Sequence, residues 1–113
     1  MAESTANATT VVESAPLWVV ADMVKAGGFD VVLVVSEDQQ LLGMLRSDAV
    51  LRLAPRLPEA PVRLLPLQKV AQIDTWAHAG QALAADAEVE GVALGIGGFW
   101  SVLLREQAAE LAA

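Results

Sequence analysis

The fold is decided by residues 31–48, which read VVLVVSEDQQLLGMLRSD. The apolar run at 31–35, with four valines among its five residues, predicts a strand covered on both faces. The polar residues 36–40 predict a solvated turn, and a second strand is expected to end near Gly43. Ser47 and Asp48 are residue types that open helices, so a helix is expected from about Ser47. The rest of the chain is expected to pack on this unit or to repeat it.

The composition limits the size and the kind of core. A chain of 113 residues forms one compact domain or two very small subdomains that share a core. With 55% hydrophobic and 4% aromatic residues, the core must consist of Ala, Val and Leu. This apolar content predicts an exposed apolar face and self-association, most simply as a homodimer.

The charge and the missing cysteines exclude several classes of function. A net charge of −7 without any run of Lys or Arg argues against binding to nucleic acid or to anionic membranes. The absence of cysteine excludes disulfides and thiolate chemistry, and a single histidine argues against a zinc site. Neither a secretory signal nor a stretch of ~18 apolar residues is present, which predicts a cytoplasmic protein.

The first half of the chain contains one strand–helix–strand–strand–helix unit, expected over residues 10–54. Residues 1–9 are predicted to be disordered and residues 10–12 to form a short strand. Ser14 is expected to cap a helix that runs to about Ala26 and ends at Gly27-Gly28. Four residues spaced as one helical stripe should be buried: Leu17, Val20, Ala21 and Val24.

A proline-rich linker, residues 55–69, separates this unit from a second one at residues 70–113. At an offset of 60 residues, Asp74 aligns with Ser14 and Val92 with Val32. The alignment predicts a helix over 75–87, capped by Asp74, and a strand over 91–96. A turn at 97–98, a short strand over 99–101 and a closing helix over 102–111 should follow. If Gly98 is the counterpart of Gly43, the second turn is about five residues shorter than the first.

The repeated element order and the glycine before the last strand and helix resemble the cystathionine β-synthase (CBS) domain. Two such domains in tandem form a Bateman module. The resemblance implies an α/β fold, with two βαββα motifs packed about a pseudo-twofold axis and two clefts between them. It also implies a dimer, and clefts that bind AMP, ADP, ATP or S-adenosylmethionine and regulate an attached enzyme or transporter. For this chain, a regulated protein in trans is the expected partner. A ferredoxin-like α+β domain shares part of this element order and stays open as an alternative.

The candidate ligand-binding residues are Arg46, Ser47, Asp48 and Ser101. In the family motif, a Ser or Thr follows the glycine by three positions and faces phosphate, and an Asp three positions later binds the ribose. Ser101 fits the first position relative to Gly98. In the first copy the hydroxyl and the carboxylate are Ser47 and Asp48, each one place off that spacing. Helix capping is the alternative role of both residues.

No catalytic constellation is visible in the sequence, so the chain is not expected to be an enzyme. His78 has no Ser or Asp at a spacing that predicts catalysis, and residues 95–98 predict a tight turn instead of a phosphate loop. The leading hypothesis is a stand-alone regulatory or sensor module. The alternative is a ligand-free oligomerisation scaffold, in which Trp18, off the buried stripe of its helix, contacts another subunit.

Overall fold

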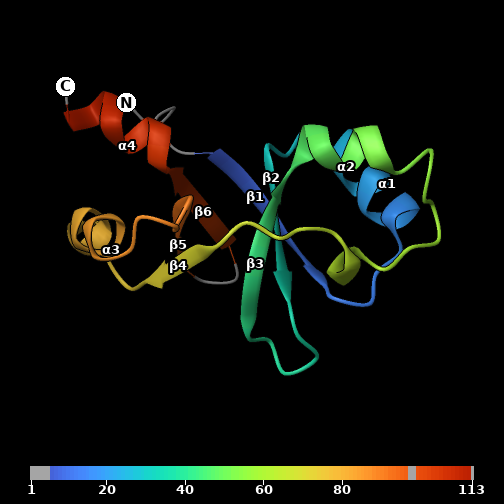
Figure 1. Cartoon of the computed structure of the whole chain (residues 1–113), viewed down its shortest axis with the longest axis horizontal. Helices are drawn as coiled ribbons and strands as arrows, with labels where there is room; N and C mark the ends of the chain where they lie inside the picture. Colours follow the sequence, from blue (N-terminus) through green and yellow to red (C-terminus); the bar gives the residue numbers. More distant parts are fainter. Residues whose placement is uncertain (1–5, 97–98, 113) are drawn as a thin grey trace.

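The computed structural model describes residues 6–96 and 99–112, which form the predicted strand–helix–strand–strand–helix order twice (Figure 1). The first half contains β1 (Ala6–Val12), α1 (Leu17–Gly27), β2 (Val31–Val35), β3 (Leu41–Arg46) and α2 (Ser47–Leu53). The second half contains β4 (Val70–Ile73), α3 (Ala79–Ala85), β5 (Gly91–Ile96), β6 (Phe99–Leu104) and α4 (Arg105–Ala112). Two short 3-10 helices, η2 (Val62–Leu64) and η3 (Trp76–His78), precede β4 and α3.

The two halves pair their strands in the same way. In the first half, β1 runs parallel to β2, and β2 runs antiparallel to β3. In the second half, β4, β5 and β6 repeat this arrangement. The six strands form one sheet in the order β3-β2-β1-β6-β5-β4. The fold is therefore α/β and built of two βαββα motifs, as predicted.

The contacts between the halves follow a pseudo-twofold axis. Ala6 of β1 pairs with Val102 of β6. An isolated antiparallel bridge joins Gln68, ahead of β4, to Met44 of β3. The strand registers make Gln68 the counterpart of Ala6, and Met44 the counterpart of Val102. Each half thus offers its third strand to the beginning of the other half's first strand.

Strand β2 is buried along its whole length because both of its faces are covered. Val32 and Val34 face a core formed with α1 and α2, whereas Val31 and Leu33 face a core shared by the two halves. Successive side chains of a strand point to opposite faces, which explains the continuous valine run. A third core packs α3 against β5 and β6. Figure 1 shows α1 and α2 together on one side of the strands and α3 at the opposite end.

The starts of β1 and α1 correct two predictions. β1 begins at Ala6, so residues 6–9, expected to be disordered, pair with β2 and β6. α1 begins at Leu17 without a side-chain cap, and the Ser14 hydroxyl instead donates to Glu37 at 3.3 Å. The proline-rich linker supplies the missing acceptors, since Leu17 N donates to Ala60 O and Trp18 N to Pro58 O. The predicted stripe is buried, and Gly28, the residue after the helix, ends it with a left-handed φ of 65°.

The second half corrects two further predictions. The closing helix begins at Arg105 instead of 102, because Val102, Leu103 and Leu104 continue β6 and pair with β5. Their burial alternates between two cores, a period of two that belongs to a strand. Helix 75–87 is divided into η3 and α3, and its cap is Thr75, whose hydroxyl accepts from Ala77 N. The predicted turn at 97–98 lies outside the described residues. No helix among the described residues is long and apolar enough to span a membrane.

Candidate functional site

A cavity of about 250 Å³ lies where β3 passes into α2, next to the segment that leads into β4. The first half supplies β3 and α2, and the end of the linker, residues 65–68, supplies the rest of the lining just before β4 begins. The cavity is lined by Leu45, Arg46, Asp48, Ala49, Arg52, Leu53, Leu65, Pro66 and Gln68. The site is called the first cleft below.

The first cleft contains two of the predicted residues, Arg46 and Asp48. Ser47, between them, is buried, and its hydroxyl donates to Phe29 O at 2.7 Å. Its backbone N–H donates to Asp30 O at 3.0 Å. Ser47 therefore holds the start of α2 to the segment between α1 and β2, and it does not line the cavity. Neither Ser47 nor Asp48 makes the side-chain cap that was their alternative role.

Gln68 is the member of the cleft that sequence reasoning missed. It lines the cavity, and its side-chain Oε1 is buried without a hydrogen-bond partner among the described residues. A buried acceptor without a partner costs free energy, so such atoms commonly mark a place where a ligand or water binds. No sequence motif predicts Gln68 as a binding residue. Only its position directly ahead of β4, where the repeat brings the two halves together, could have indicated that it lies in the cleft.

Arg46 is already paired in this structure. Its guanidinium contacts both carboxylate oxygens of Glu106 in α4, at 2.7 and 3.0 Å. The hydrogen bond with Glu106 raises the pKa of Arg46 above its usual value, and the same bond lowers the pKa of Glu106. Arg52, the second arginine of the cleft, makes no ion pair within the described part of the chain. The two arginines give the cleft a cationic side in an otherwise acidic protein.

Ser101 does not lie in the first cleft. The registers β2–β3 and β5–β6 pair Val34 with Gly43 and Leu94 with Ser101, so Ser101 itself is the counterpart of Gly43. The predicted alignment of Gly43 with Gly98 is therefore wrong. The predicted alignment is off by three positions, and a ligand-binding role of Ser101 stays a prediction. Ser101 lines a separate cavity of about 480 Å³, together with Asn7, Thr9, Phe29 and Trp100 among others.

The second half does not reproduce the first cleft. At the counterpart of Arg46 it has Leu104, and at the counterpart of Gln68 it has Ala6. At the position of Ser47 it has Arg105, whose guanidinium donates to the carbonyls of Leu83, Asp86 and Val89 at 2.8 to 2.9 Å. Arg105 thereby caps the C-terminal end of α3. The counterparts of Arg46 and Gln68 therefore lack the positive charge and the side-chain amide of the first cleft.

Gly43 is required by the close approach of the two halves. A Cβ at this position would lie 2.8 Å from the Leu67 Cβ and 3.0 Å from the Gln68 carbonyl oxygen. Gly43→Ala should therefore destabilise the protein by about 1–3 kcal/mol, measured by urea unfolding. Gly80→Ala is the control, since a Cβ there meets nothing within 4 Å and alanine is the better helix former. Equal stability of the wild type and the Gly43 variant would contradict this packing.

Comparison with known proteins identifies the class to which this architecture corresponds. No protein-family model and no curated protein matches the chain. Solved structures do match it over nearly its whole length, and they are CBS-domain proteins. The chain therefore has the fold of a tandem CBS pair, as the sequence resemblance implied.

Three of these structures illustrate the match. A hemolysin-like CBS protein of Oenococcus oeni has a TM-score of 0.67 at 9% identity, over 96% of this chain and 85% of its own. A CBS domain-containing protein of Kribbella flavida has a TM-score of 0.63 at 16% identity, over 98% and 97%. A CBS domain protein of Pyrobaculum aerophilum, complexed with AMP, has a TM-score of 0.57 at 16% identity, over 94% and 92%.

Proposed function

We propose that the protein is a cytoplasmic regulatory module that binds an adenine nucleotide in the first cleft and acts on a separate protein. The observation that carries the proposal is Gln68, which lines the cavity together with two arginines and an aspartate and whose buried Oε1 has no hydrogen-bond partner among the described residues. These residues come from the first half and from the end of the linker ahead of β4, so a ligand there would contact both segments. The AMP complex of the Pyrobaculum aerophilum protein is consistent with this ligand class.

Each polar side chain of the cleft can form hydrogen bonds to one part of a nucleoside phosphate. A Gln amide both donates and accepts, which matches the adjacent amino group and ring nitrogen of adenine. The Asp48 carboxylate accepts from ribose hydroxyls, and Arg46 and Arg52 donate to phosphate. A volume of about 250 Å³ lies just below the usual range of small-molecule sites, which begins at about 300 Å³. It favours a monophosphate over a larger ligand.

Calorimetry with AMP tests this function. Gln68→Leu should weaken AMP binding roughly tenfold, because leucine has neither the donor nor the acceptor. The stability of the ligand-free variant should be equal or higher, since the substitution removes a buried unsatisfied oxygen. Gln72→Leu is the matched control, because Gln72 is exposed on β4 and does not line the first cleft. Unchanged AMP binding by the Gln68 variant would place the ligand elsewhere.

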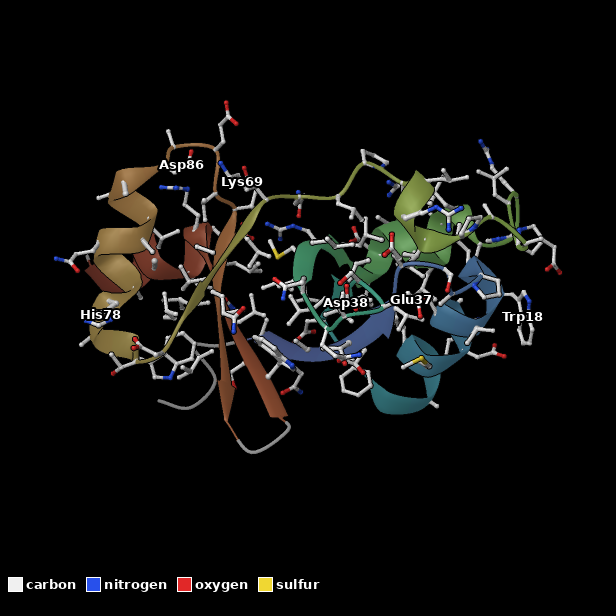
Figure 2. The ribbon with its side chains drawn as sticks, turned by 90° about the horizontal axis from the view of Figure 1, so that it is seen from below. Trp18, Glu37, Asp38, Lys69, His78 and Asp86 are labelled. Carbon is white, nitrogen blue, oxygen red and sulfur yellow. The ribbon has the colours of Figure 1, made fainter. Side chains whose placement is uncertain are left out.

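A ligand-free scaffold is the second candidate, and exposed apolar side chains favour it. Trp18 and Leu57 are 47% and 51% exposed. Both lie where α1 contacts the linker, because the Trp18 N–H donates to the carbonyl of Pro58, the residue that follows Leu57. Figure 2 shows Trp18 at the opposite end of the molecule from His78, where a second copy could pack without covering the second half. A homodimer with no heat of binding for AMP, ADP, ATP or S-adenosylmethionine, and the same melting temperature with and without them, would establish the scaffold.

A further inference from the structure

One ion pair links the two halves at the mouth of the first cleft. Arg46 is the last residue of β3 in the first half, and Glu106 is in the first turn of α4 in the second. The two carboxylate oxygens accept from two different guanidinium nitrogens, at 3.0 and 2.7 Å. The geometry is the bidentate one that arginine forms with planar or tetrahedral anions.

The pair contributes little to stability and is easily exchanged. The side chain of Arg46 is 31% exposed and that of Glu106 is 61% exposed. Ion pairs with this much solvent access contribute little to the stability of a protein. An anion of similar geometry and higher charge can therefore replace the Glu106 carboxylate at small cost.

Glu106 uses two of the five guanidinium N–H donors of Arg46, one on each terminal nitrogen. A phosphate can bind this same end-on pair of N–H groups. Arg46 also lines the cavity, beside Asp48 and Arg52. A ligand phosphate in the first cleft can bind Arg46 in this way only after the carboxylate has left it.

The second half cannot form a corresponding pair. The strand registers make Leu104 the counterpart of Arg46. The residue directly before α2 is thus a cation, Arg46, whereas the residue directly before α4 is the apolar Leu104. The ion pair is therefore a feature of the first cleft alone and does not follow from the symmetry of the fold.

We infer that Glu106 is an internal competitor for Arg46, which lowers the affinity of the first cleft for phosphate-bearing ligands and is displaced when one binds. This inference rests on the proposed function. Its consequence is regulatory, because binding exchanges a link between the halves for a link to the ligand. The ligand thereby changes how α4 is held to the first half.

Calorimetry on Glu106→Gln tests the competition. The substitution keeps the shape of the side chain and removes its charge. Affinity for AMP and for inorganic pyrophosphate should rise about two- to fivefold, the factor that corresponds to an exposed ion pair. Affinity for adenosine, which has no phosphate, should stay the same. Asp38→Asn is the matched control for net charge, since Asp38 lies in the β2–β3 turn at the other end of β3.

The outcomes separate this inference from the proposed function. Equal affinity of the wild type and the Glu106 variant for AMP would overturn the competition and leave nucleotide binding intact. An equal gain for adenosine would also overturn it, because the effect would not depend on phosphate. A gain for pyrophosphate, with AMP and adenosine bound no better than pyrophosphate alone, would support the competition and contradict the adenine site. No heat with any of the three probes in either protein would overturn both.

Discussion

Leu33→Ala is expected to destabilise the protein by about 2–5 kcal/mol, a large part of the stability of a domain of this size. Leu33 is fully buried and lies in the core that the two halves share, with Val31, Met44 and Ala93. Truncation would remove apolar contacts and leave a cavity between the halves. Urea unfolding followed by circular dichroism measures the change.

Leu42→Ala provides the matched control for this experiment. Leu42 belongs to the same hairpin but is 46% exposed, so its truncation should change stability by less than about 0.5 kcal/mol. If Leu33→Ala costs no more than Leu42→Ala, the two halves do not share a packed core. The pseudo-twofold arrangement would then be contradicted.

Arg105→Met is expected to destabilise the second half by about 2–4 kcal/mol. The guanidinium donates to three backbone carbonyls, those of Leu83, Asp86 and Val89, and so holds the end of α3 against β5 and the start of α4. Methionine fills a similar volume and cannot donate, so these acceptors would lose their partner. Thermal unfolding and hydrogen exchange of α3 amides report the loss.

Arg63→Met separates this effect from the removal of a positive charge. Arg63 is exposed in η2, and its side chain makes no hydrogen bond within the described part of the chain. We expect a change below about 0.5 kcal/mol. Increased hydrogen exchange confined to α3 and α4 in the Arg105 variant would support this role of the Arg105 guanidinium. Equal stability of the Arg105 and Arg63 variants would refute it.

The elements of the first half could be predicted because local chemistry and tertiary packing agree there. The valine run of β2, the stripe of α1 and the glycine that ends α1 each indicate the structure that is observed. The start of α1 could not be predicted, because its first N–H groups are bound by linker carbonyls at 58 and 60. No local pattern reveals an acceptor so distant in sequence.

The prediction for the second half is wrong at β6 because the local sequence there is ambiguous. Val102, Leu103 and Leu104 fit a helix as well as a strand, and only pairing with β5 decides between them. The error moved the expected start of α4 from Arg105 to Val102. A short apolar run beside a glycine-rich turn does not contain enough information to fix a register.

The site was predicted only in part, for a related reason. Arg46 and Asp48 lie in the first cleft because the end of β3 and the start of α2 are local features. Gln68 and Glu106 reach the same region through the packing of one half on the other. Sequence spacing within one motif carries no information about such contacts.

We propose that the ligand site is one cleft, between β3–α2 and the segment ahead of β4. Nuclear magnetic resonance of the labelled full chain during titration with AMP tests it most directly. We predict the largest amide shifts at Ala49 and Gln68 in the first cleft, with saturation at one AMP per chain. Shifts centred on Ser101 and Trp100, or no shifts at saturating AMP, would contradict the claim.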